Sequence, residues 1–260
     1  MGPSGVKAIK EKLPSIIKEK KINFVILNGE NAGDKGVGIT KKIFDEFLTA
    51  GADVITTGNH VWDEKEVLEF ISKDKRLLRP ANLTKGSPGN GMGIYISKNK
   101  KKVAVLNLMG NVFMKKSDDV FEEAKKFIGN VRLKRDTDFI VVDIHGEITS
   151  EKMAMGFLFD GKATLIVGTH THVPTSDHRI MEKGTAYQTD LGMCGDYESV
   201  IGMNRENSLK KFLKDSSAKK HFPAIGDATI SGVMVEADDQ TGLAKKIQPI
   251  ILGRSLQERK

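Results

Sequence analysis

The sequence has very little cysteine and no long hydrophobic run. Cys194 is the one cysteine among 260 residues, which excludes an internal disulfide and any zinc or iron–sulfur site built on several thiolates. No stretch approaches the roughly 18 apolar residues that a membrane helix needs. Residues 1–14 mix lysine and glutamate with short apolar pairs, so they lack the core of a signal peptide. We therefore expect a cytoplasmic protein that does not associate with membranes.

Aromatic residues and charge blocks are also scarce. The chain has three tyrosines and one tryptophan, and no basic stretch is interleaved with aromatics as in stacking platforms for RNA. Forty-one lysines and arginines against 34 acidic residues give a net charge of +7, without a block of five like charges. This balance is compatible with a phosphate-bearing partner, and equally with a charged surface that serves solubility alone.

The composition is that of a globular protein, and the pattern alternates helix and strand. No repeat or low-complexity linker divides the chain, so we expect one domain over residues 1–260. Thr40 is expected to cap a helix that ends at Gly51, and Asp63 and Glu66 have capping-box spacing at the head of another. Pro14 is expected to kink or divide the first helix. Helices are predicted at 5–20, 41–50, 117–129, 150–158 and 205–214, strands at 23–27, 53–57, 139–144 and 164–167, and hairpins at 91–108 and 231–252.

Polar residues able to bind metal follow four separate strands. Because ligands collect beyond the carboxyl ends of strands in α/β sheets, these side chains are expected to converge on one site. Four of the six histidines lie at such positions. The candidates are Glu30 with Asn31, Asn59 with His60, His145, and His170 with His172.

The donor set predicts a metal centre without sulfur. Histidine, carboxylate and asparagine suit Fe, Mn, Zn or Ni. If residues 170–172 are extended, both imidazoles of His-Thr-His point to the same side and reach one cluster. A carboxylate such as Glu30 is able to bridge two ions about 3.5–4 Å apart, which favours a phosphoester substrate. His60 would then be free to protonate the leaving oxygen, although a structural role for it stays open.

Seven motifs occur in an order that resembles a known family. They cover nearly the whole chain, and their combination is similar to the bacterial YmdB-like branch of the calcineurin-like metallophosphoesterases. This resemblance implies an α/β fold, a four-layer α/β/β/α sandwich of two mixed sheets. The motifs are Asn-Gly-Glu-Asn at 28–31, Gly-Asn-His-Val-Trp-Asp at 58–63, Arg-Pro-Ala-Asn at 79–82, Asp-Ile-His-Gly-Glu at 143–147, Gly-Thr-His-Thr-His at 168–172, Lys-Gly-Thr-Ala-Tyr at 183–187 and Asp-Leu-Gly-Met at 190–193.

The resemblance also implies roles for the candidate residues. It implies two metal ions, with iron favoured and manganese or zinc as alternatives, and a bridging hydroxide that attacks a 2′,3′- or 3′,5′-cyclic nucleotide. Glu30 resembles the bridging carboxylate, and His60 the proton donor. The ligands implied for the first metal are Asn31 and His172, and those implied for the second are Asn59, His145 and His170.

One departure from the family concerns the start of the sequence. The family opens on an apolar strand ending in Gly-Asp, whose Asp is a ligand of the first metal. Residues 1–5 (Met-Gly-Pro-Ser-Gly) resemble the loop after that strand. Either the start codon is placed too late, which we favour because a sheet edge would otherwise be exposed, or the chain lacks one ligand.

Other functions and roles stay open at this stage. A phosphomonoesterase or phosphoprotein phosphatase would use the same metals, and a catalytically weak regulator would bind a nucleotide or RNA without turnover. A homo-oligomer is plausible by resemblance. Arg79 is a candidate for a phosphate contact or a structural ion pair, and residues 86–93 for a loop that enters a hairpin. Asp143 and Glu147 are candidates for orienting His145.

Overall fold

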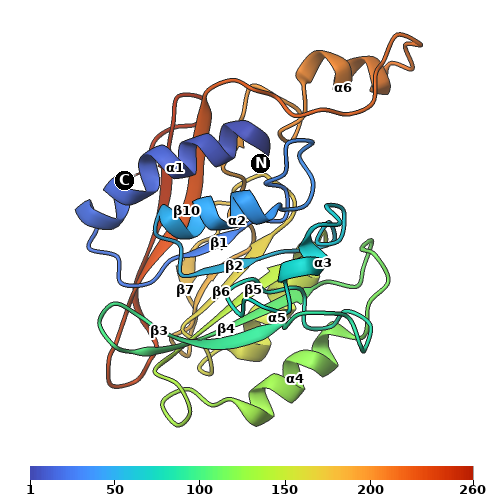
Figure 1. Ribbon diagram of the computed structural model, residues 1–260. Coiled ribbons are helices and arrows are strands. Elements are labelled where there is room, and N and C mark those ends of the chain that lie inside the picture. Colours follow the sequence, from blue (N-terminus) through green and yellow to red (C-terminus); the bar gives the residue numbers. More distant parts are fainter. Residues whose placement is uncertain (260) are drawn as a thin grey trace.

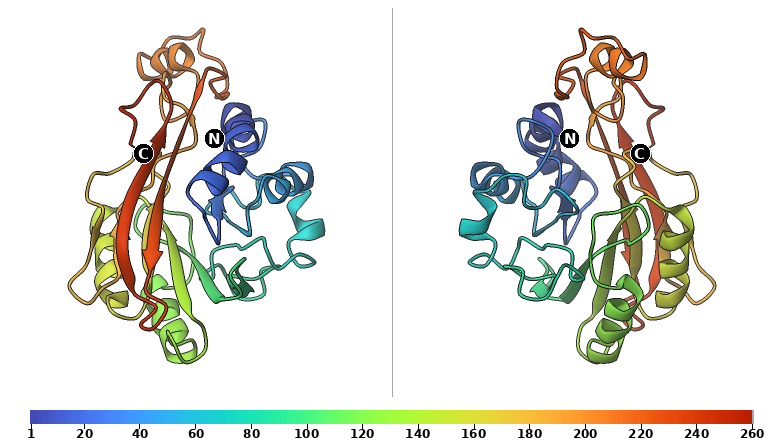
Figure 2. Two further views of the ribbon diagram at one scale, coloured as in Figure 1. Left: turned by 90° about the vertical axis from the view of Figure 1, so that its left-hand side faces the viewer. Right: turned by 90° about the vertical axis from the view of Figure 1, so that its right-hand side faces the viewer.

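Apolar segments of strand length and amphipathic helical segments form layers in the computed structural model, which describes residues 1–259. Helices α1 and α2 lie on one side and α4 and α5 on the other, with the strands between them (Figures 1 and 2). The helices are α1 (Gly2–Glu19), α2 (Lys41–Thr49), α3 (Val67–Phe70), α4 (Val120–Asn130), α5 (Thr149–Phe159) and α6 (Arg205–Phe212). The strands are β1 (Ile26–Asn28), β2 (Val54–Thr56), β3 (Met92–Ile96), β4 (Lys102–Met109), β5 (Phe139–His145), β6 (Leu165–Thr169), β7 (Arg179–Ile180), β8 (Ala186–Gln188), β9 (Gly195–Asp196), β10 (Ala228–Ala237) and β11 (Ala244–Leu252).

The largest sheet has six strands in the order β3-β4-β5-β6-β8-β7. Its four central strands are parallel, while β3 and β7 pair antiparallel at the edges. Facing it are the parallel pair β1-β2 and the antiparallel sheet β9-β10-β11. The predicted helix–sheet–sheet–helix arrangement is confirmed. Within residues 1–259, however, the layer that faces the six-stranded sheet consists of two separately hydrogen-bonded sheets, not one.

Three buried clusters hold the layers together. One packs α1 and α2 against β1 and β2, and a second packs α4 and α5 against β4, β5 and β6. The third joins Val54 and Leu78 to Val103 and Val105, so it lies between the β1-β2 pair and the six-stranded sheet. No helix within residues 1–259 is both long and apolar enough to cross a membrane.

Local predictions for the helix ends are partly confirmed. The Thr40 hydroxyl accepts from the Ile43 N–H at 3.3 Å, and Gly51, at φ +109°, follows α2 as expected. Helix α1 runs through Pro14 without being divided, and the proline lies on the exposed face of the helix. The capping box at Asp63 and Glu66 is wrong, since α3 starts at Val67 without a side-chain cap and Asp63 contacts His60 instead.

The register of the strands brings four carboxyl ends together. Asn28 pairs with Thr56 at the end of β1 and β2, and His145 pairs with Thr169 at the end of β5 and β6. The residues that follow these strands therefore meet at one edge of the two facing sheets, as their order in the sequence predicts.

Candidate metal centre and active site

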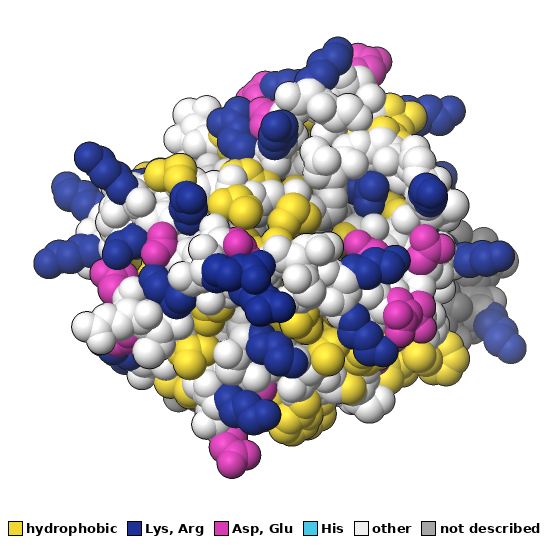
Figure 3. Space-filling model, turned by 90° about the horizontal axis from the view of Figure 1, so that it is seen from below, with side chains coloured by type: hydrophobic (Ala, Val, Ile, Leu, Met, Phe, Trp, Pro, Cys, Tyr) yellow, Lys and Arg dark blue, Asp and Glu magenta, His cyan; other side chains and the backbone are white. Residues whose placement is uncertain are grey.

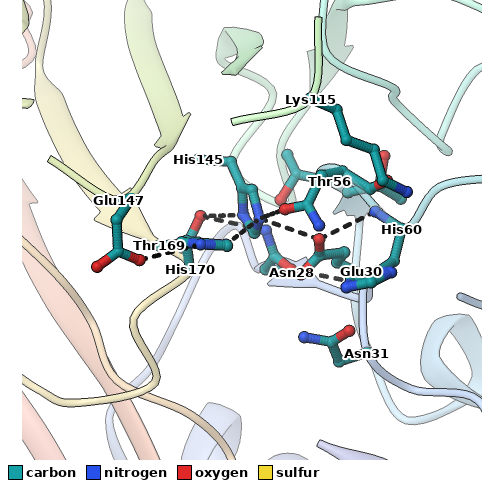
Figure 4. A network of polar contacts seen from close by, with 12 residues as sticks. Asn28, Glu30, Asn31, Thr56, His60, Lys115, His145, Glu147, Thr169 and His170 are labelled. Atoms are coloured by element: carbon teal, nitrogen blue, oxygen red, sulfur yellow. Dashed lines mark hydrogen bonds and ion pairs between the residues drawn. The ribbon is translucent and has the colours of Figure 1, made fainter. Parts of the chain in front are cut away.

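The predicted site residues lie together where these strands end. Figure 4 shows Glu30, His145 and His170 pointing toward one another, with Asn31 to one side and His60 beyond Glu30. One ligand atom from each of Glu30, His145 and His170 lies within 4.8 Å of the other two. Strand β1 positions Glu30, β5 supplies His145 as its last residue, and His170 directly follows β6.

The Nε2 atom of His145 is the centre of this group. It lies 3.0 Å from Glu30 Oε1, 3.0 Å from Asn59 Oδ1 and 3.1 Å from His170 Nδ1. The side chains of His145 and Glu30 are 1% and 2% exposed, so the pair is buried. A carboxylate oxygen, an amide oxygen and an imidazole nitrogen thus surround one ring nitrogen.

Hydrogen bonds on the far side of the ring fix which nitrogen carries the lone pair. Thr169 donates its hydroxyl to Asp143 Oδ1 at 2.7 Å, and it accepts from His145 Nδ1 at 3.0 Å. A neutral His145 therefore carries its proton on Nδ1, and its Nε2 lone pair faces other acceptors. Several acceptor atoms that point toward one buried position fit a cation. Because the acceptors are histidine, carboxylate and amide groups, they suit Fe, Mn or Zn.

Asp143 acts on His145 through Thr169, and not directly as expected. Its other oxygen, Oδ2, accepts from Asn28 Nδ2 at 2.9 Å and from the Thr56 hydroxyl at 2.6 Å. The expectation for Glu147 is wrong, because its Oε2 lies 3.2 Å from His170 Nε2 and not beside His145. The reason is that the chain turns away after β5, which carries Glu147 to the side of the site where His170 lies.

Asn31 and His172 form a second group beside the first. Asn31 Nδ2 donates to His172 Nε2 at 2.9 Å, while His172 Nδ1 donates to the Ile201 carbonyl at 2.7 Å. Asn31 Oδ1 is buried and has no hydrogen-bond partner within residues 1–259. A buried amide oxygen without a donor is costly, so this atom also fits a cation ligand.

The electrostatics of the site keep Glu30, His170 and His172 in the form that binds a cation, whereas without a cation they favour a proton on His145. Burial raises the pKa of Glu30, but the neighbouring His145 and His60 outweigh it and lower that pKa to about 2. Burial disfavours charge on His145 as well, yet Glu30 raises the pKa of His145 above its ordinary value. Burial, followed by the proximity of His145, lowers the pKa of His170 to about 4, and burial lowers the pKa of His172. His170 and His172 are therefore neutral at pH 7.

The His-Thr-His segment reaches the site by a different route from the one predicted. His170 and His172 have φ values of +110° and +66°, so the segment is a strained loop and not extended. Both imidazoles still reach the site, one beside His145 and the other beside Asn31. Positive φ at two non-glycine residues is rare and requires surrounding structure that holds it in place.

A buried ion pair holds this loop. Lys152 Nζ lies 2.8 Å from Asp190 Oδ2 and 3.2 Å from the Thr169 carbonyl, and Asp190 Oδ2 also accepts from the Thr171 N–H. Both side chains are almost wholly buried. No sequence pattern pointed to Lys152, because a lysine in a predicted helix is expected at the surface. Gly168 makes room for it, because an added Cβ would lie 2.6 Å from Lys152 Cδ.

His60 lies at the solvent side of the site. Its backbone N–H donates to Glu30 Oε1 at 3.1 Å, and its ring Nδ1 lies 2.6 Å from Asp63 Oδ2. Its side chain is 32% exposed, in contrast to the buried His145. Asp63 also pairs with Lys115, whose Nζ donates to the Asn59 carbonyl at 2.7 Å. No sequence pattern pointed to Lys115, because the loop that carries it approaches His60 only in the fold.

The space around these residues is a cavity of about 370 Å³. Glu30, Asn31 and the imidazoles of residues 145, 170 and 172 line one part of it, and apolar side chains such as Ile26 and Val141 line another. Gly58 borders the site, where an added Cβ would lie 2.3 Å from the His145 ring. Only glycine therefore fits at the turn that leads to Asn59.

Arg79 takes no part in this site. Its guanidinium donates to the carbonyls of Pro80, Ala81, Ser87 and Pro88, so it holds the loop before β3 through backbone contacts and not through an ion pair. Residues 86–93 enter the β3-β4 hairpin as expected.

Comparisons with known proteins identify the class. A 2′,3′-cyclic-nucleotide 2′-phosphodiesterase of Bacillus subtilis (strain 168) is 44% identical over 252 residues, which cover 97% of this chain and 94% of the relative. A crystal structure of a novel phosphatase from Mycoplasma pneumoniae superposes with a TM-score of 0.88 at 38% identity, covering 97% of this chain and 90% of that one. A crystal structure of a hypothetical protein from Thermus thermophilus also gives 0.88, at 34% identity, covering 97% and 96%. The α/β/β/α fold and this similarity define a phosphoesterase-type hydrolase.

The family is equally clear. Residues 1–250 match the YmdB-like protein family, and the chain belongs to it. The predicted family, fold class and enzyme class are confirmed.

We expect Lys152→Met to destabilise the protein by about 3–5 kcal/mol, because it leaves the Asp190 carboxylate buried without its partner. Chemical denaturation measures this directly. Lys162→Met, at an exposed lysine that follows the same helix, is the control and should change stability by less than about 0.5 kcal/mol. Equal effects of the two substitutions would contradict a structural role for the buried pair.

Acid should destabilise the metal-free protein through His170. Its pKa is about 4 in the fold against 6.5 ordinarily, so the unfolded chain alone takes up this proton between those values, and stability falls as pH is lowered through that range. The difference corresponds to about 3 kcal/mol, and partial exposure of the ring reduces the expected effect to about 2 kcal/mol. Chemical denaturation at pH values from 7 to 4.5, in the presence of chelator, should show that the free energy of unfolding falls less for His170→Asn than for the exposed control His221→Asn. Equal pH dependence of the two variants would contradict the lowered pKa of His170.

Proposed function

We propose that the protein is a metal-dependent phosphodiesterase that hydrolyses cyclic nucleotides, 2′,3′- or 3′,5′-linked, within a single domain. The observation that carries this is the buried convergence of Glu30, Asn59 and His170 on His145 Nε2. Acceptor atoms gathered in this way are unfavourable together unless a cation or a proton lies among them, and a metal ion satisfies all of them at once. The similarity to the Bacillus subtilis phosphodiesterase supports the substrate class.

Two sets of residues would hold the metals. Asn59, His145 and His170 form the more complete set and Asn31 and His172 the other, and Glu30, which contacts His145, would serve both. The donor types favour iron, with manganese or zinc as alternatives. Bound cations of this kind polarise phosphoryl oxygens and make water a stronger nucleophile at neutral pH.

The protein's own residues would orient the substrate and supply the proton. The His60 ring is partly exposed and contacts Asp63 rather than the ligand candidates, so it would be free to protonate the departing ribose oxygen. Asp63, 2.6 Å from Nδ1, holds the ring in this orientation. The Glu30 contact to the His60 N–H keeps this backbone against the site.

Two other functions make different demands. A phosphomonoesterase or phosphoprotein phosphatase would use the same ligands and would prefer a monoester. A nucleotide- or RNA-binding regulator needs a continuous basic surface, whereas Figure 3 shows lysines and arginines dispersed among acidic, apolar and neutral side chains on the face it presents. The similarity to the Bacillus subtilis phosphodiesterase favours the diesterase. A cytoplasmic location and a homo-oligomer stay predictions.

Metal content and turnover test the proposal. Protein purified without chelator should contain about two ions per chain by elemental analysis, and Glu30→Gln should lower that content. No metal in folded protein, even after addition of Mn²⁺ or Fe²⁺, would overturn the proposal.

We expect His60→Ala to lower kcat for a 2′,3′-cyclic nucleotide by about 10²–10⁴-fold while the metal content stays unchanged, because the ring would donate a proton and bind no metal. His221→Ala, at an exposed position, is the control. Faster hydrolysis of a nucleoside monophosphate than of the cyclic diester would instead support the phosphomonoesterase.

A further inference from the structure

The loop of residues 110–119, between β4 and α4, is firmly attached at its base. The Gly110 N–H donates to the His145 carbonyl at 2.9 Å, and the Asn111 N–H donates to Glu151 Oε1 at 2.9 Å. The Asn111 side chain donates to the Ser117 hydroxyl and the Asp118 carbonyl, and it accepts from the Val120 N–H. One asparagine thus closes the loop from within.

The same loop contacts the opposite side of the site. Lys115 Nζ donates to the Asn59 carbonyl at 2.7 Å and lies 3.5 Å from Asp63 Oδ1, and Figure 4 shows Lys115 close to His60. The loop therefore joins the backbone of His145 to that of Asn59, and residues 112–114 lie between these two anchors.

Between the two anchors lies an aromatic residue whose exposure and backbone conformation do not contribute to the stability of the fold. Phe113 is 85% exposed and has φ +60°, a left-handed conformation that costs a bulky residue about 1–2 kcal/mol. Its neighbour Val112 is 46% exposed. An exposed ring in a strained conformation, on a loop held at both ends, points to a contact made with a ligand.

We propose that Phe113 is the platform on which the base of the nucleotide substrate stacks; this rests on the proposed function. Phe113 precedes by two residues Lys115, which contacts Asn59 and Asp63 beside His60, so the loop holds the ring next to the site, where the base of a nucleotide with its phosphate among Glu30, His60 and His145 would extend. Stacking of a base on an aromatic ring contributes about 1–3 kcal/mol and tolerates every base. The site would therefore discriminate nucleotides from diesters that lack a base, without strong selection among bases.

The test compares substrates with and without a base. Phe113→Ala should lower kcat/KM for 2′,3′-cyclic AMP by about tenfold to a hundredfold, and leave that for ethylene phosphate, a five-membered cyclic diester without a base, within about twofold. Phe113→Trp should restore turnover of the nucleotide. The control is Phe212→Ala, at a residue of α6 that is 78% exposed, and it should alter neither substrate. An equal loss for both substrates, or no loss for the nucleotide, would overturn the proposal.

A binding measurement tests the role of Phe113 independently of the proposed enzymatic activity. Titration calorimetry with adenosine 3′-monophosphate should show binding weaker by about tenfold or more for Phe113→Ala than for the wild type, whether or not turnover is found. Absence of turnover with this loss of binding would overturn the proposed function and leave the platform supported. Equal binding by the two proteins would overturn the platform.

Discussion

The carboxylate of Asp143 is the contact on which the site depends. It belongs to β5 and accepts from Asn28 of β1, Thr56 of β2 and Thr169 of β6, so one buried group joins the four strands whose ends form the site. Burial raises its pKa, and the three donors oppose that change. Through Thr169 it also sets the orientation of the His145 ring. The two facing sheets and the metal-ligand candidates are therefore positioned by the same interaction.

Around this contact the protein concentrates unfavourable features that a ligand would relieve. Acceptor atoms face one another at His145 Nε2, the Asn31 oxygen lacks a donor within residues 1–259, and His170 and His172 adopt left-handed conformations. The Lys152–Asp190 pair holds the strained loop from beneath, and its desolvation is offset by hydrogen bonds to backbone groups. The surrounding structure thus holds the candidate ligands in place.

Much of the fold was predictable because its signals are local. The spacing of apolar residues indicated most helices and the longer strands, and the Thr40 cap and the Gly51 end were read from residue type alone. The short strands β7, β8 and β9 were not predicted, since, unlike β1 and β2, they do not lie within an apolar run of strand length. The capping box predicted at Asp63 was wrong for a different reason. A carboxylate at this position is able either to cap the helix or to contact a neighbouring side chain, and the position of His60 in the fold decides between them.

The sequence by itself determined which residues meet, because polar residues at the carboxyl ends of parallel strands must lie at one edge of the sheets, whatever the details. That rule placed Glu30, Asn31, Asn59, His60, His145, His170 and His172 in one site. Only the tertiary structure decided which atoms face one another and what supports them. Burial of Lys152, the path from Asp143 through Thr169, and the closeness of Lys115 to His60 join segments far apart in the chain. Such contacts follow from packing, which no local pattern encodes.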